Sequence, residues 1–134
     1  MSQVEAVQSM LAPLFPGLMG LQLVEVTKER VVATLVVRPD LCTTGESMHG
    51  GAFMAFADTL GGVATFVNLP PNTRTTTVES STKFLRGAPV GSTVRAECTP
   101  FHKGRTTMVW QTLIRGNDDR LCAVVTQTQL VIPV

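Results

Sequence analysis

The clearest hydrophobic pattern in this chain is an apolar run from Gly50 to Asn68, which predicts a long helix that Pro70-Pro71 ends. Small and apolar residues occupy nearly every face of this helix, so we expect it to be buried on most of its circumference. Asp58 is the only charged side chain between Gly50 and Thr73. A lone buried carboxylate is costly unless it is paired, hydrogen-bonded or protonated, which makes Asp58 a candidate functional residue.

Hydrophobic and polar positions alternate through most of the remaining chain, as in β-strands. Before the long helix, the pattern predicts a short helix at residues 3–12, two strands within residues 21–37 that turn at Glu29-Arg30, and a loop at 39–48. After it, the pattern predicts four strands, at residues 75–85, 93–99, 106–115 and 121–132. Turns are expected between them at residues 87–91, 102–105 and 116–119.

This order of elements predicts an α+β fold, an antiparallel β-sheet wrapped around one long central helix, with the last three or four strands forming a meander. The 134 residues fit a single domain, residues 1–134, without a repeat or linker. Such a sheet leaves an edge strand, which invites pairing with a second subunit.

Composition narrows the range of partners. The chain carries a net charge of +1, only 5% aromatic residues and no run of basic residues, so we expect no nucleic-acid partner. Residues 50–69 are long enough to span a bilayer, but they contain Asp58 and four glycines without a closely flanking Lys or Arg. We therefore interpret them as a packed helix and expect no membrane partner.

Cysteine usage and the N-terminus indicate the compartment. The three cysteines are odd in number and show no CxxC spacing, as expected of free thiols in a cytosolic protein. The first residues lack a basic segment followed by a long apolar core, so no signal peptide is apparent. The expected location is cytoplasmic.

His49-Gly50-Gly51 stands at the start of the apolar run. The first backbone N–H groups of a helix are unpaired, and they are ready donors to an anion or oxyanion. Each residue also has a purely structural interpretation: Asp58 caps a loop, His49 orients the loop before the helix, and the glycines allow close packing. Gly61-Gly62, one turn beyond Asp58, favours the close approach of another helix.

These residues resemble the hotdog-fold acyl-CoA thioesterases, most closely the PaaI-like branch of the phenylacetate pathway. The resemblance rests on His49-Gly50-Gly51 with Asp58 and on residues 75–79, 84–86 and 104–105, and it covers residues 20–132. It implies hydrolysis of an acyl-CoA thioester, with Asp58 as the catalytic acidic residue, Gly50 as the oxyanion-hole amide and His49 shaping the site. Neither a metal nor a cofactor is expected, since coenzyme A is part of the substrate.

The resemblance also implies substrate-binding positions. Thr43 stands six residues before His49, where the family often carries an Asn or Gln that holds the water or the thioester carbonyl. A threonine hydroxyl reaches less far than an amide, so Thr44, Glu46 and Ser47 stay open as substitutes. Thr76 or Thr77 matches the Ser or Thr that the family often has in the next strand, and Gly51 completes this set.

Coenzyme A carries phosphates, so cations should line its entry. The candidates are Arg86, His102, Lys103, Arg105 and Thr106. Ordinary solvated turn charge is the alternative for each of them.

The spacing of Gly50 and Asp58 has a consequence of its own. Eight residues along one helix separate them by about 12 Å, whereas a base and an oxyanion donor must both lie near one carbonyl. Two antiparallel helices from two subunits satisfy both needs, so we expect a homodimer with equivalent sites at its interface. The resemblance implies that such dimers often pair into tetramers.

Several alternatives stay open at this point. Asp58 can act as a general base or as a nucleophile, and the acyl group can be an aryl or a medium-chain one. A non-catalytic acyl-CoA-binding module is a second hypothesis. A hydratase or dehydratase on the same fold is a third, although its Gly-Asp-x-Asn-Pro and His-Phe-Pro-Gly-His signatures are absent.

Overall fold

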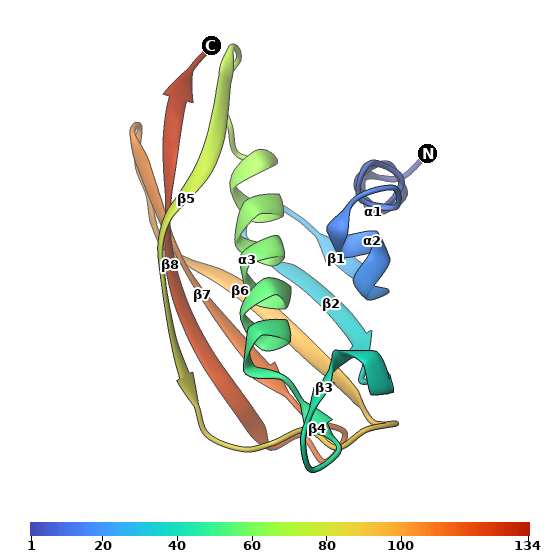
Figure 1. Cartoon of the computed structure of the whole chain (residues 1–134). Coiled ribbons are helices and arrows are strands. Elements are labelled where there is room, and N and C mark those ends of the chain that lie inside the picture. The colour runs from blue at the N-terminus through green and yellow to red at the C-terminus, as the bar shows by residue number, and fades with distance from the viewer.

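The computed structural model describes all 134 residues and has a six-stranded antiparallel sheet with one long helix, α3 (Gly50–Phe66), lying across one face (Figure 1). The order of the strands across the sheet is β1-β2-β6-β7-β8-β5. Their bounds are β1 Gln22–Val26, β2 Val31–Val36, β5 Thr73–Phe84, β6 Thr93–Lys103, β7 Thr107–Arg115 and β8 Leu121–Pro133. The predicted α+β hotdog arrangement is confirmed.

Strand β5 lies outside the meander of the last strands. Strands β6, β7 and β8 form a three-stranded meander, which is within the prediction of three or four strands, and β5 pairs with β8. It therefore lies at one edge of the sheet, with its second side unpaired. The chain after β5 crosses below the first turn of α3 to reach β6 on the far side (Figure 1).

The opposite edge of the sheet is covered by two short helices, α1 (Gln3–Leu11) and α2 (Phe15–Met19). The side-chain amide of Gln8 donates to the carbonyl of Leu21 at 2.9 Å and accepts the N–H of Leu23 at 2.7 Å. This contact occupies backbone groups at the β1 edge, so β5 is the more open of the two edges.

The segment before α3, expected as a loop, contains regular structure. It holds one 3-10 turn, η1 (Pro39–Leu41), and a two-stranded hairpin of β3 (Cys42–Thr43) and β4 (Ser47–Met48). Gly45 and Glu46 turn this hairpin with positive φ angles of 82° and 54°. The hairpin lies at the N-terminal end of α3 (Figure 1).

Helix α3 packs on the sheet by one side only. Phe56, Leu60 and Ala64 are fully buried against a core that includes Trp110. The opposite side of the helix is exposed at Gly51, Met54, Asp58 and Phe66. The prediction of a helix buried on most of its circumference is therefore wrong for this chain, because the sheet curls over only one side of it (Figure 1).

None of the helices combines the length and the apolar character that crossing a membrane requires.

Candidate active site

The carboxylate of Asp58 is anchored at the surface of α3. Its Oδ1 accepts a hydrogen bond from the Thr77 hydroxyl at 2.6 Å and one from the Gln127 side-chain amide at 3.1 Å. Its Oδ2 receives no hydrogen bond from the chain. Asp58 is exposed, so the prediction that its carboxylate is buried is wrong. One oxygen is thus fixed, and the other is free to meet a water or a carbonyl group.

A chain of hydrogen bonds extends from Asp58 into the sheet. Gln129 donates through Nε2 to the Thr77 hydroxyl at 2.5 Å, and its Oε1 accepts from the Thr75 hydroxyl at 2.9 Å. Gln127 and Gln129 are each only 1% exposed. Sequence reasoning missed both glutamines. The available signal was two amides at inward positions of β8, between the inward Val125 and Val131.

Gly61 allows the sheet to approach α3 at this point. A Cβ atom built on Gly61 would lie 2.2 Å from the Gln127 side-chain carbon Cδ. The group packed closely against Gly61 is therefore a side chain of β8. The second helix that was expected to approach this glycine is not found within the chain. Gly62 has open space around it and lines the same hollow as Asp58.

The N-terminus of α3 presents one unpaired amide. His49 is the N-cap, and its Nδ1 accepts the N–H of Gly51 at 2.8 Å. The carbonyl of His49 accepts from the N–H groups of Ala52 and Phe53. The N–H of Gly50 therefore stays free, whereas that of Gly51 is occupied, which favours Gly50 as an oxyanion donor.

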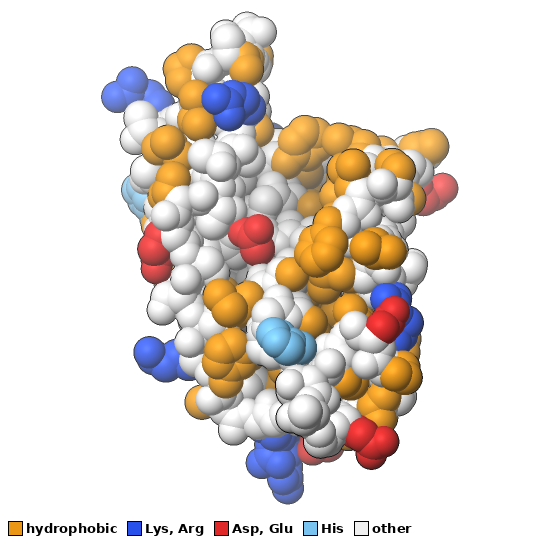
Figure 2. Space-filling view, viewed as in Figure 1, with side chains coloured by type: hydrophobic (Ala, Val, Ile, Leu, Met, Phe, Trp, Pro, Cys, Tyr) orange, Lys and Arg blue, Asp and Glu red, His pale blue; other side chains and the backbone are white.

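Two hollows lie along the exposed side of α3, one beside His49 and the other beside Asp58. The His49 hollow, of about 400 Å³, is lined by His49, Gly51 and mostly apolar residues of α2, η1 and α3. The Asp58 hollow, of about 370 Å³, is lined by Asp58, Thr77 and residues of α1 and α3. Neither hollow contains both His49 and Asp58. Figure 2 shows hydrophobic side chains gathered on this face, with acidic and histidine side chains among them.

The two threonine positions offered by the sequence are now distinguished. Thr77 faces α3 and contacts Asp58. Thr76 also borders the Asp58 hollow, but it pairs with Leu130, and its side chain points to the other face of the sheet because successive residues of a strand alternate. Thr43 lies exposed on the β3–β4 hairpin and forms no side-chain hydrogen bond.

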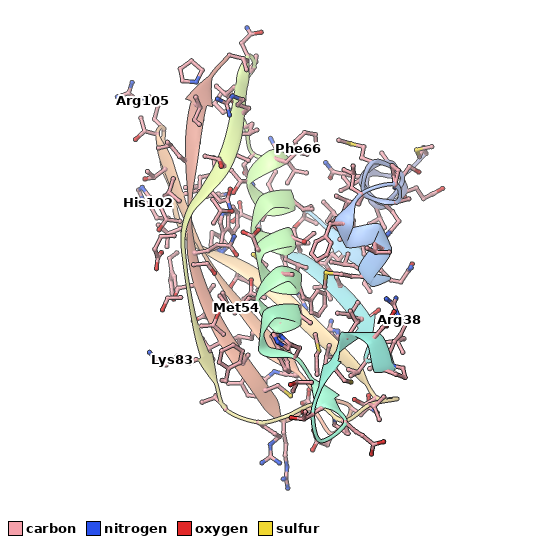
Figure 3. The ribbon with its side chains drawn as sticks, in the orientation of Figure 1. Arg38, Met54, Phe66, Lys83, His102 and Arg105 are labelled. Carbon is pink, nitrogen blue, oxygen red and sulfur yellow. The ribbon has the colours of Figure 1, made fainter.

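The candidate phosphate-binding residues are not brought together within one chain. Arg86 lies beside the β7–β8 turn, next to Asn117 and Asp118. The other four, His102, Lys103, Arg105 and Thr106, lie at the opposite end of β6 and β7. His102 and Lys103 belong to β6 itself, which corrects the expected turn at 102–105. Figure 3 shows His102 and Arg105 on the far side of the sheet from α3.

Lys103 also differs from the other cations in its pairing. Its ammonium group forms an ion pair with Glu29 in the β1–β2 turn. Arg86 and Arg105 form no ion pair, so their charges are the more available to a phosphate.

Three side chains have shifted pKa values. The Arg38 guanidinium, 3.0 Å away, lowers the pKa of Asp40 at the rim of the His49 hollow. Burial raises the pKa of the Cys98 thiol to about 12 and also raises the pKa of Cys122. No group of three His, Cys, Asp or Glu side chains is placed to hold a metal ion.

Comparison with known proteins gives a consistent picture. The sequence profile described as the thioesterase superfamily matches residues 45–123. A Deinococcus radiodurans protein described as an esterase is 33% identical over 103 residues, which cover 76% of this chain and 64% of that protein. The 1,4-dihydroxy-2-naphthoyl-CoA hydrolase of Escherichia coli is 33% identical over 75 residues, which cover 56% of this chain and 54% of the hydrolase.

Among solved structures, a thioesterase from Haemophilus influenzae superposes with a TM-score of 0.92 at 26% identity, covering 99% of this chain and 92% of the other. The chain spans less than two thirds of the length of the Deinococcus and Escherichia relatives. The profile match includes α3 with Asp58, β5 with Thr77, and strands β6 and β7, and it ends within the first residues of β8. This chain belongs to the thioesterase superfamily.

Proposed function

We propose that the protein hydrolyses acyl-CoA thioesters and that Asp58 performs the chemistry. The observation that carries this proposal is the asymmetry of the Asp58 carboxylate, with Oδ1 held by Thr77 and Gln127 and Oδ2 unpaired and accessible. A carboxylate held in this way can accept a proton from water or attack a carbonyl carbon directly. The free N–H of Gly50, at the positive end of the α3 dipole, supports a matching role as oxyanion donor.

Two reaction courses fit these groups. As a general base, Asp58 takes a proton from a water whose oxygen attacks the thioester carbon, and the proton then passes to the departing thiolate of coenzyme A. As a nucleophile, Asp58 forms a mixed anhydride and releases the thiolate, and water hydrolyses the anhydride to the free acid. In both courses the carbonyl oxygen gains negative charge, which the Gly50 N–H stabilises. Neither course requires a cofactor.

The proposed active species is a homodimer with two equivalent sites. Gly50 and Asp58 are separated by about 12 Å along α3, and Gly50 does not line the Asp58 hollow, so one chain does not present both groups to one carbonyl. An antiparallel pair of α3 helices would bring Gly50 of each copy to Asp58 of the other. The exposed apolar side of α3 and the open edge of β5 support this pairing. We further propose that two dimers associate into a tetramer.

The same pairing supports the proposed site for coenzyme A. If the β5 edges of two copies meet antiparallel, Arg86 of one copy lies at the end of the joined sheet that carries His102 and Arg105 of the other. We propose that these cations, with Thr106, bind the phosphates of coenzyme A. Because Lys103 is paired with Glu29, its contribution is expected to be smaller.

The proposed acyl group is an aryl or medium-chain one. Apolar residues such as Leu18, Leu41 and Ala52 line the His49 hollow, next to the proposed oxyanion donor. We also propose a cytoplasmic location, because the three cysteines are unpaired, as in proteins of reducing compartments.

The test is thiol release from a panel of aryl and straight-chain acyl-CoAs, read with a disulfide indicator, for wild type and Asp58→Asn. We expect wild-type activity that falls at least about 100-fold in the variant. The panel profile then identifies the acyl class. A wild-type protein that binds acyl-CoA but hydrolyses no member of the panel would contradict the proposal and favour a non-catalytic binding module.

A further inference from the structure

Gln127 is a buried amide directly beneath the candidate catalytic carboxylate. Its Nε2 donates to Asp58 Oδ1 at 3.1 Å and approaches the main-chain carbonyl of the same residue at 3.4 Å. Its Oε1 is buried without a hydrogen-bond partner. A buried amide with an unpaired acceptor is unfavourable for stability, so packing alone does not account for a glutamine at this position.

Gly61 provides the space that Gln127 occupies. A Cβ atom on Gly61 would lie between 2.2 and 2.4 Å from Cδ, Nε2 and Oε1 of Gln127. Glycine also weakens the interior of a helix relative to alanine. Two locally unfavourable choices, a helical glycine and a buried amide, thus meet at one contact, and the group that benefits from it is Asp58.

The direction of the hydrogen bonds follows from the neighbouring groups. The Thr77 hydroxyl has a single proton, which it donates to Asp58, so it accepts from Nε2 of Gln129. The Thr75 hydroxyl donates to Oε1 of Gln129, which fixes the orientation of that amide. Asp58 Oδ1 therefore receives one donor from β5 and a second, independent donor from β8.

We propose that Gln127 is a positioning residue for Asp58 and that Gly61 exists to admit it. The terminal torsion of an aspartate is soft, so a single donor such as Thr77 leaves the carboxylate free to rotate. A second donor on the same oxygen fixes the carboxylate plane and holds Oδ2 toward the thioester. This inference rests on the proposed thioesterase activity, and Gln127 itself does not touch the substrate.

The first test replaces the donor and keeps the volume. Gln127→Met removes Nε2 with little change in shape, so we expect kcat to fall about 10- to 100-fold while KM stays unchanged. Thr112→Val is the matched control, because Thr112 is another fully buried polar residue on the inner face of the sheet that does not contact Asp58. The control is expected to retain wild-type kcat. A Gln127→Met enzyme with wild-type kcat would overturn the proposal.

The second test separates positioning from packing. Gly61→Ala places a methyl group in the volume of the Gln127 amide and is expected to lower both thermal stability and kcat. Gly61→Ala combined with Gln127→Ala removes the clash, so we expect stability to recover while kcat stays low. Recovery of wild-type kcat in this double variant would show that Gln127 acts only as packing.

A third measurement keeps this inference separate from the proposed reaction. In ¹⁵N-labelled protein, the Nε2 protons of Gln127 should shift when Asp58→Asn removes the charged acceptor, whether or not a substrate is known. An inactive wild type in the acyl-CoA panel would overturn the thioesterase proposal. Unchanged Gln127 resonances in Asp58→Asn would instead overturn the contact on which the positioning role depends.

Discussion

The Nδ1 atom of His49 accepts the backbone N–H of Gly51 at 2.8 Å, so the histidine caps the helix that carries Asp58. A Cβ atom on Gly51 would lie 2.9 Å from the same nitrogen, so the glycine allows the ring to fold back. This cap occupies the second amide of α3 and leaves the first, that of Gly50, unpaired. His49 therefore caps the helix, Gly51 accommodates and donates to the cap, and Gly50 keeps a free N–H.

Replacing His49 separates capping from chemistry. Asparagine is a preferred N-cap and can accept the Gly51 N–H, whereas alanine cannot. We expect His49→Ala to lower the free energy of unfolding by about 1 kcal/mol and His49→Asn to leave it near the wild-type value, as measured by urea denaturation. His49→Asn should also keep kcat within a few-fold. An Asn variant as inactive as Asp58→Asn would show that the imidazole itself takes part in the reaction.

The indole of Trp110 depends on one residue of α3 for its hydrogen bond. Its Nε1 donates to the Thr65 hydroxyl at 2.8 Å, and both residues are fully buried. Thr65→Val leaves this N–H unpaired in the core, so we expect a loss of about 1–3 kcal/mol in the free energy of unfolding. Thr59→Val is the control, because that half-buried hydroxyl only donates to the Ala55 carbonyl. Equal losses in the two variants would contradict this account.

The local elements of the fold were predictable because their signals are local. Turn residues such as Gly116-Asn117 and the alternation within each strand identify the strands without reference to the rest of the chain. The place of β5 was not predictable in this way. Neighbouring strands in sequence usually pair, whereas the partner of β5 lies 37 residues or more beyond its end, counting from Phe84 to Leu121.

The candidate site was predicted in part for the same reason. Asp58 stood out because it is the only charge in an apolar run. Its exposure was predicted wrongly, because apolar residues on the outer side of a helix give the same pattern whether a sheet or a second subunit covers them. The contact between Gln127 and Gly61 joins residues 66 positions apart, and nothing in the local sequence of either residue indicates the other.

Arg86 and Arg105, which form no ion pair, are expected to contribute to substrate binding without affecting the chemical step. Arg105→Ala and Arg86→Ala should each raise KM for an acyl-CoA several-fold and leave kcat unchanged, because a phosphate contact far from the carbonyl acts equally on the ground and transition states. Lys103→Ala is the matched control, since Glu29 already neutralises that charge. The measurement compares acyl-CoA with the corresponding acyl-pantetheine, which lacks the nucleotide. An equal rise in KM for both substrates would contradict phosphate binding by these arginines.

Gly50 can be deprived of its N–H without disturbing the helix. Proline lacks this hydrogen and is favoured at the first position of a helix, and the residue before it, His49, has the extended backbone (φ −63°, ψ 139°) that a following proline requires. We expect Gly50→Pro to fold and to lose most of kcat. Gly50→Ala, which keeps the N–H but adds a methyl group near Phe84, should retain more activity. Equal activity in the two variants would argue against an oxyanion role for this amide.

Mixing two inactive variants tests whether each site is shared between subunits. If a site takes Gly50 from one chain and Asp58 from another, a pair made of one Asp58→Asn chain and one Gly50→Pro chain contains one intact site and one doubly defective site. Random assembly from equal amounts then restores about one quarter of wild-type activity, although each variant alone is inactive. Co-expression of the two chains followed by thiol-release assays measures this directly. If each site lay within a single chain, no mixture would regain activity, because every chain would carry one defect.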